Sequence, residues 1–357
     1  MMSINVAVTG LNATDNPAPG LGVIRSLHHP NKWEGTIIGL AYDVYDTGVY
    51  DAGLLDDTFM IPYPNQGAEQ ILERLLYINS QVHIDVIIPT LDSELLLYQK
   101  LQPRLKEAGI SMYLPTEEVV KRRAKSKLVE FCKEHNIPTP KTIIVNDPAN
   151  LTRAIEEVGY PLYVKGIFYE AFKCQTSDEV LSMFEKLRNK WGLPILLQES
   201  LNGEEFDVCT VGDHQGELLG AVPIRKLRLT DKGKAWVAVT IKNQQLYDLS
   251  CHILKALKWS GPCELEIVQD FNTKEFLLLE INPRFPSWIY LSTGANQNLP
   301  KLVVDLALGK KVKPLPQAKS GVTFVRHATD LVCPMEYIEK LTVHGELHYQ
   351  HLNSNQG

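Results

Sequence analysis

Residues 261–288 read GPCELEIVQDFNTKEFLLLEINPRFPSW, in which two largely apolar stretches flank the polar segment DFNTK. Acidic residues recur at every second position of the first stretch, the spacing of side chains on one face of a β-strand. Two such stretches joined by a short polar segment predict a β-hairpin. We expect an odd-length connection centred on Thr273.

This connection determines which residues face one another across the hairpin. Glu266 then lies opposite Glu280, and Glu264 lies opposite Asn282. Alternation places these four polar side chains on one face and an apolar set on the other. The expected apolar set comprises Leu265, Ile267, Leu277, Leu279 and Ile281.

The polar face would bring three carboxylates together, and these repel one another unless a cation lies between them. Mg²⁺ suits this environment because it binds through one or two carboxylates together with substrate phosphates and water. Arg284 follows directly, and a guanidinium suits bidentate contact with phosphoryl oxygens. The alternative is an amphipathic hairpin with a solvated polar face, but solvated faces usually mix charges of both signs.

Residues 1–115 alternate between short β-rich runs and helical segments. The β-rich runs are 4–9, 36–41, 85–89 and 111–115, and the helical segments are 23–27, 68–80 and 93–107. This alternation predicts a parallel, doubly wound sheet. The turn Thr90–Glu94 follows one strand at the carboxyl edge of that sheet, where ligands commonly bind.

The middle of the chain predicts a separate unit. A basic joint at 116–127 leads into a helix at 125–135, which the prolines of the turn 136–140 end. The following α+β unit is expected as strand 142–145, helix 148–158, strand 160–166, helix 178–190 and strand 194–200. Long β-rich stretches and a helix at 244–258 precede the hairpin, and the chain closes with a β-like and helical tail that frays at its end.

Composition excludes several classes of protein. The 357 residues include 36 Lys and Arg against 42 Asp and Glu, a net charge of −6, so we expect no general affinity for nucleic acid or an anionic membrane. No apolar run approaches the ~20 residues of a bilayer span, and the N-terminus lacks a secretory pattern, which predicts a cytoplasmic protein. Six scattered cysteines without a CxxC pair argue against a zinc site or a disulfide framework.

With these residues in view, the chain resembles the ATP-grasp superfamily, in particular the branch similar to the carbamoyl-phosphate synthase large subunit and stand-alone carboxylate–amine ligases. The resemblance covers roughly residues 1–316, and ELEIVQD…FLLLEINPR looks like the magnesium hairpin of that family. It implies an α/β and α+β architecture, an ATP-grasp fold with an N-terminal Rossmann-like domain. The expected parts are a Rossmann-like domain (1–116), a small lid subdomain (117–200), a large subdomain with the hairpin (201–316) and a C-terminal extension (317–357).

The resemblance assigns roles to the hairpin residues. Glu266 matches the first metal-bridging residue, Glu280 the second, and Asn282 the amide ligand of the second metal. Arg284 matches the arginine that contacts the transferred phosphoryl group. The implied cofactors are ATP and Mg²⁺, with Mn²⁺ as an alternative ion.

Two further lysines resemble the phosphate ligands of the family. Lys165 matches the lysine that reaches the α- and β-phosphates, and Lys127 matches the lysine that opens the preceding helix. A glycine-rich flap normally follows the first of these, whereas this chain has GIFYEAFKC at 166–174, with a single glycine. Phosphate contact would then pass to Lys173, unless Lys173 is an ordinary solvated lysine.

The remaining nucleotide contacts come from the run LLQESL, which resembles the hinge strand of the family. Its backbone, with Gln198, Glu199 and Leu201, would read the adenine edge. Glu205 would hold the ribose hydroxyls.

The acceptor side is less defined. In the run PIRKLRL, Lys226 and Arg228 share one face of a strand and Arg225 lies on the other. These residues either grip an acidic substrate or form a basic edge strand that discourages aggregation.

The resemblance implies an ADP-forming ligase that joins a small-molecule or peptide carboxylate to an amine through an acyl phosphate. A small-molecule kinase on the same fold and a non-catalytic ATP-binding module remain alternatives. No nucleic acid or membrane partner is expected, and a homodimer is compatible with the sequence.

Overall fold

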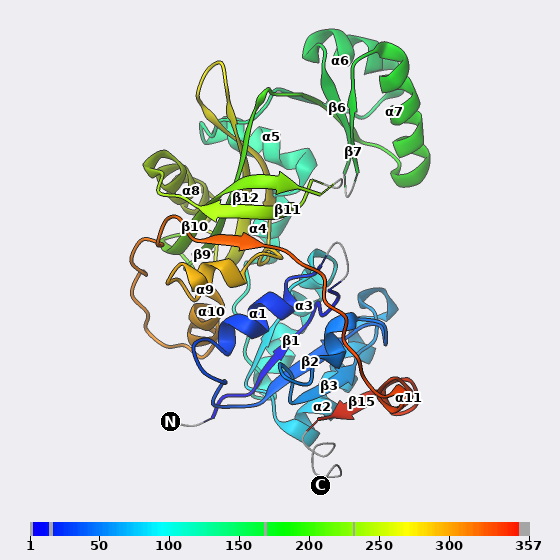
Figure 1. Cartoon of the computed structure of the whole chain (residues 1–357). Helices are drawn as coiled ribbons and strands as arrows, with labels where there is room; N and C mark the ends of the chain where they lie inside the picture. Colours follow the sequence, from blue (N-terminus) through cyan, green and yellow to red (C-terminus); the bar gives the residue numbers. More distant parts are fainter. Residues whose placement is uncertain (1–2, 14–16, 168–169, 231–232, 350–357) are drawn as a thin grey trace.

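The computed structural model describes residues 3–13, 17–167, 170–230 and 233–349 (Figure 1). Three sheets organise these residues. The four-stranded sheet with its two helices stands apart from the N-terminal domain, and the six-stranded sheet lies between them (Figure 1). In the described part of the chain, no helix combines the length and apolarity that a membrane crossing needs.

The N-terminal sheet has the strand order β15-β3-β2-β1-β4, in which the first four strands of the chain run parallel. Its elements are β1 (Val6–Val8), α1 (Gly20–Leu27), β2 (Ile37–Ala41), η1 (Thr47–Tyr50), β3 (Asp57–Met60), η2 (Pro64–Gln66), α2 (Ala68–Val82), β4 (Val86–Ile88) and α3 (Asp92–Glu107). The parallel, Rossmann-like arrangement confirms the sequence prediction. Strand β3 was not anticipated, and the strand expected at 111–115 is wrong, because it is reduced to a single bridge between Ser111 and Val86.

The basic joint is helical. It forms α4 (Glu117–Arg122) and α5 (Lys125–Glu134). An antiparallel sheet of order β5-β8-β6-β7 follows. It is built from β5 (Thr142–Val145), η3 (Pro148–Asn150), α6 (Leu151–Val158), β6 (Leu162–Gly166), β7 (Ala171–Cys174), α7 (Ser177–Trp191) and β8 (Ile195–Glu199).

The large sheet has the order β13-β12-β9-β10-β11-β14. Its elements and the segments that cover it are β9 (Gly203–Gly212), β10 (Leu218–Leu229), β11 (Ala235–Thr240), α8 (Gln244–Leu257), β12 (Gly261–Asp270), β13 (Phe276–Asn282), α9 (Tyr290–Gly294), α10 (Leu299–Ala307) and β14 (Thr323–Val325). Two apolar clusters run without interruption from this sheet into the N-terminal domain, whereas the four-stranded sheet has a cluster of its own. The N-terminal and large parts are therefore packed as one body.

The hairpin has the predicted pairing at its polar end. Glu266 lies opposite Glu280 and Glu264 lies opposite Asn282. The connection is the even-length loop 271–274, however, and the register shifts by one residue at Leu279.

The shift changes which leucines reach the core. Residues C-terminal to the loop alternate in the opposite phase from the prediction until the bulge restores it. Phe276 and Leu278 are buried, whereas Leu277 and Leu279 are only half-buried. The expected placement of Leu277 and Leu279 on the apolar face is wrong.

The C-terminal segment belongs to both large bodies. Strand β14 pairs with β11 of the large sheet, and β15 (Glu346–His348) pairs with β3 of the N-terminal sheet after α11 (Met335–His344). The backbone carbonyl of Gly345 accepts hydrogen bonds from Met60 N (2.8 Å) and from the Arg74 guanidinium (2.8 Å). This segment is thus attached to both bodies through residue 349, and the end HLNSNQG (351–357), where the sequence predicts fraying, lies outside the described residues.

Leu347 tests this attachment, since its side chain is 1 % exposed in the core beneath β15. Leu347→Ala should lower the free energy of unfolding by about 2–5 kcal/mol, because it leaves a cavity. Val343→Ala, at an exposed position of α11, should change it by less than about 0.5 kcal/mol. Urea unfolding followed by circular dichroism measures both free energies. If both substitutions had equally small effects, the placement of β15 against the core would be contradicted.

Candidate active site

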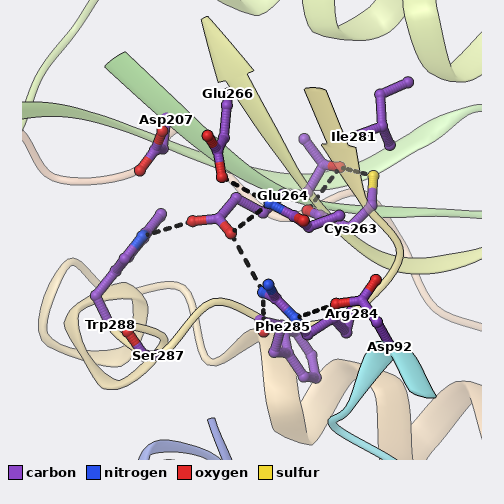
Figure 2. Close-up of polar contacts among 12 residues, drawn as sticks. Asp92, Asp207, Cys263, Glu264, Glu266, Ile281, Arg284, Phe285, Ser287 and Trp288 are labelled. Carbon is purple, nitrogen blue, oxygen red and sulfur yellow. Dashed lines mark hydrogen bonds and ion pairs between the residues drawn. The ribbon is translucent and has the colours of Figure 1, made fainter. Parts of the chain in front are cut away.

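The polar face of the hairpin is a connected cluster. The Asn282 side-chain amide donates hydrogen bonds to Glu266 (Oε1, 2.8 Å) and to Glu264 (Oε2, 3.2 Å). The Trp288 indole donates to the other oxygen of Glu264 at 2.9 Å (Figure 2). Glu264 therefore accepts hydrogen bonds at both of its oxygens, while Glu266 keeps an oxygen outside these contacts.

A lysine–aspartate pair from the adjoining strands completes this cluster. Lys226 on β10 places its Nζ 3.0 Å from Asp207 Oδ1 and 3.2 Å from Glu205 Oε2. Both Lys226 and Asp207 are buried, with side chains 6 % and 4 % exposed. Because β10 is an interior strand, the edge-strand interpretation of Lys226 is wrong.

The ammonium group of Lys226 affects the pKa values of two neighbouring carboxyl groups, Asp207 and Glu266. Burial raises the pKa of Asp207 well above its ordinary value, and Lys226 offsets this only in part. Burial also opposes ionisation of Glu266, but Lys226, Lys234 and Asn282 together hold the pKa of Glu266 below its usual value. Glu266 is therefore the ionised partner, and Asp207 is the carboxyl group that accepts a proton first.

Two lysines approach the other side of the hairpin. Lys125, at the start of α5, lies 3.5 Å from Glu280 Oε2. Lys165 on β6 donates a hydrogen bond to Gln198 Oε1 at 2.6 Å, and Gln198 donates to Thr142 Oγ1. Burial and the charge of Lys125 lower the pKa of Lys165, whereas burial raises the pKa of Glu280 despite Lys125.

Arg284 lies at the edge of the cluster, between two carboxylates. Its Nε donates to Asp92 Oδ2 at 2.9 Å, and its Nη1 lies 3.3 Å from Glu264 Oε2 and 3.1 Å from the Phe285 carbonyl (Figure 2). The side chain is 13 % exposed. The nearby acidic groups, led by Asp92, raise the pKa of Arg284 although burial opposes this, so the guanidinium is a permanent buried cation.

A cavity of about 240 Å³ opens beside Arg284. One wall comes from the N-terminal domain, from Ala18 before α1 and Ser93 at the start of α3. The opposite wall comes from the large sheet and includes Lys226, Glu266 and Trp288. The cavity thus joins the acidic cluster to the carboxyl edge of the parallel sheet, as expected for the turn Thr90–Glu94.

The donor set can be tested against the implied metal. No group of three or more His, Cys, Asp or Glu side chains within the described ranges is arranged to hold an ion by itself. Glu266, Glu280 and Asn282 nonetheless supply hard oxygen donors around one point of the hairpin. This set fits Mg²⁺, which needs few protein ligands when substrate phosphates supply the rest, better than an ion that needs a full protein cage.

Other predicted residues lie farther from the cluster. Lys127 is exposed on α5, about 200° around the helix axis from Lys125, which occupies the side facing the hairpin. Lys173 is exposed on the edge strand β7. Among the described contacts, none joins either lysine to the acidic cluster, and part of the 166–174 flap, residues 168–169, lies outside the described chain.

The hinge residues have defined places. Glu199 ends β8, and its carboxylate accepts a hydrogen bond from the Lys141 backbone amide at 2.6 Å. Leu201 is half-buried in the connection from β8 to β9, and Glu205 lies on β9 beside Lys226. The sequence analysis missed Asp207 and Lys125, and it included Asp92 only as part of the turn Thr90–Glu94. The available signal for Asp207 was the alternation in EEFDV (204–208), where Asp207 stands two residues after Glu205.

Comparisons with known proteins agree with this geometry. A family model described as ATP-grasp in the biosynthetic pathway with Ter operon matches residues 193–330. This range contains the large sheet and the whole hairpin. The chain has an ATP-grasp fold.

Solved structures with the ATP-grasp fold cover nearly the whole chain. The biotin carboxylase domain of Hydrogenobacter thermophilus 2-oxoglutarate carboxylase, crystallised with MgADP and bicarbonate, is 17% identical with a TM-score of 0.68 over 90% of this chain and 73% of that one. L-amino acid ligase from Bacillus licheniformis is 16% identical (TM-score 0.64, 88% and 76%). N5-carboxyaminoimidazole synthetase from Staphylococcus aureus is 13% identical (TM-score 0.64, 89% and 80%).

Lys226 tests the electrostatics of the cluster. Lys226→Met should destabilise the fold by about 3–5 kcal/mol, because it leaves buried carboxylates without their cation. Arg225→Met on the same strand removes an exposed pair with Glu204 and should cost no more than about 1 kcal/mol. Adding Asp207→Asn to Lys226→Met should restore part of the loss in thermal unfolding; no restoration would contradict the assigned pairing.

Proposed function

We propose that this protein is an ATP- and Mg²⁺-dependent ligase that joins a carboxylate to an amine and releases ADP and phosphate. The observation that carries the proposal is the half-buried polar face of Glu266, Glu280 and Asn282, flanked by Lys165 and Arg284 and open to a cavity. The similar folds include an L-amino acid ligase and a carboxyaminoimidazole synthetase, which supports this class of reaction.

The parts of the chain are assigned accordingly. We assign residues 1–116 to a Rossmann-like domain, 117–200 to a lid and 201–316 to the large ATP-grasp subdomain. Residues 317–357 are the C-terminal extension, whose β14 and β15 are shared between the first and third parts.

In this proposal the hairpin holds the metal through Glu266, Glu280 and Asn282. The bound ion would neutralise the phosphate oxygens and bridge them to the protein. Lys165 and Lys125 add positive charge on the nucleotide side, while Gln198, Glu199 and Leu201 line the hinge strand for the base. Lys127, Lys173 and Glu205 stay as proposed nucleotide contacts that only a bound complex would test.

The chain acts on the reacting groups by position and charge. A substrate carboxylate oxygen attacks the γ-phosphorus, the bond from that phosphorus to ADP breaks, and an acyl phosphate forms. Arg284 offsets the charge on the transferred phosphoryl oxygens. An amine then attacks the acyl carbon, the amide bond forms, and phosphate and a proton leave.

The cavity beside Arg284 supports a compact acid. Its volume of about 240 Å³ is below the ~300–1,000 Å³ typical of sites for drug-sized ligands. Lys226 and Arg284 line it together with Asp92 and Glu264. This mixture of charges suits a small polar molecule better than a long apolar chain.

Glu280 tests the metal assignment. Glu280→Gln should lower ADP release with Mg-ATP and the acceptors by about 10²–10³-fold, because it removes a ligand from an ion that stabilises developing charge. Glu275→Gln, exposed at the end of the same hairpin, should retain turnover. Unchanged turnover in a folded Glu280→Gln protein would contradict the assignment.

The order of chemistry separates the ligase from the kinase and from a silent ATP-binding module. With Mg-ATP and a pool of candidate carboxylates but no amine, hydroxylamine should trap the acyl phosphate as a hydroxamate, detected by mass spectrometry. Carboxylate labelled with ¹⁸O should pass one labelled oxygen into the released phosphate when amide forms. A stable phosphorylated alcohol would indicate a kinase, and no ADP with any acceptor would indicate a binding module.

A further inference from the structure

Asp92 connects the N-terminal domain to two arginines of the ATP-grasp part. It is the first residue of α3, and its side chain is 27 % exposed. Oδ2 accepts from Arg284 Nε at 2.9 Å, and Oδ1 lies 3.2 Å from Arg123 Nη2. The two arginines come from separate segments, the end of β13 and the joint between α4 and α5.

A buried carboxylate, that of Glu94, is hydrogen-bonded to the backbone of the turn that carries Asp92. Glu94 is 0 % exposed and accepts hydrogen bonds from the backbone amides of Thr90 (2.7 Å) and Leu91 (2.9 Å). It also accepts from the hydroxyl groups of Thr9 and Tyr42. Four donors on one buried carboxylate fix the turn, so the position of Asp92 is set by the N-terminal core.

Gly10 shows how closely this turn packs. Its φ is +67°, and a Cβ placed there would lie 2.1 Å from Thr90 Oγ1. The Thr90 hydroxyl donates to the Thr9 carbonyl at 2.9 Å. The residues that follow β1 therefore lie in contact with the turn, which leaves Asp92 little freedom to move independently of the sheet.

The described bonds to Arg284 use two of the three nitrogens of its planar guanidinium group. Nε and Nη1 donate to Asp92, Glu264 and the Phe285 carbonyl. Within the described chain no acceptor contacts Nη2, and Arg284 lines the cavity. Because a guanidinium is rigid and planar, fixing Nε and Nη1 determines the direction in which Nη2 points.

We propose that Asp92 is a positioning residue that aims Arg284 at the phosphoryl group undergoing transfer. The proposal rests on the proposed function for the identity of that group. Asp92 also holds Arg123, two residues before Lys125, which pairs with Glu280. A carboxylate of the N-terminal domain thus orders cations on both sides of the acidic hairpin.

Asp92→Asn distinguishes positioning from a simple connection between domains. The amide offers one acceptor oxygen and turns an NH₂ group toward the other arginine. We expect kcat for ADP release to fall by about 10–100-fold while KM for ATP changes less than about threefold, since small misplacements of a reacting contact have effects of this size. Glu69→Gln is the control, because it removes an ion pair with Arg104 at the far end of α3.

A double-mutant cycle tests whether Asp92 acts through Arg284. In an Arg284→Lys background, which lacks Nε, Asp92→Asn should lower kcat by less than about twofold further. A full additional 10–100-fold loss there, or a thermal shift with no loss of kcat in the single variant, would overturn the positioning role and leave a structural connection.

A measurement without ligand separates this inference from the proposed function. In protein labelled with ¹⁵N-arginine, the Nε proton resonance that is lost in Arg284→Lys belongs to Arg284. Its exchange with water should become at least about tenfold faster in Asp92→Asn and stay unchanged in Glu69→Gln; unchanged exchange in Asp92→Asn would overturn the inference. Absence of ADP release by the unaltered protein would overturn the ligase proposal instead, and the exchange rates would still decide whether Asp92 holds Arg284.

Discussion

The buried guanidinium of Arg284, held between Asp92 and Glu264, is the interaction on which the site depends. A buried charge without a partner costs several kcal/mol, so each of the three side chains requires the others. Asp92 belongs to the N-terminal domain and Glu264 to the large sheet, and therefore the charges are balanced only when the two parts are docked. The apolar clusters that pass from one part into the other provide that docking.

The four-stranded sheet stands under a different constraint. It has a separate apolar core. The two residues that it contributes to the site, Lys165 and Gln198, are hydrogen-bonded to each other. The hairpin reaches this side through Glu280, which lies near Lys125. A nucleotide bound there would contact two separately packed bodies, so its binding energy would include the energy of holding them together.

Local alternation in the sequence was enough to find the hairpin and its polar face, but the correct register came from two deviations that cancel. The loop has an even number of residues, so the pairing next to it is offset by one residue from the prediction. The bulge at Leu279 removes this offset before Glu280. Periodicity cannot detect a bulge, because the sequence Leu277–Leu279 is apolar in either phase. The sequence also could not show that Lys125, and not Lys127, faces the hairpin, because this depends on where α5 begins and how it packs.

Partners from distant strands could not be read from the sequence at all, and they change the electrostatic argument. Alternation alone predicted a strongly negative face that needs a cation. In the folded chain, six carboxylates (Asp92, Glu205, Asp207, Glu264, Glu266 and Glu280) meet six cations (Arg123, Lys125, Lys165, Lys226, Lys234 and Arg284). Such a site has no excess negative charge to attract bare Mg²⁺, but it suits a polyanion that carries the ion with it, and we therefore expect metal and nucleotide to bind as one species.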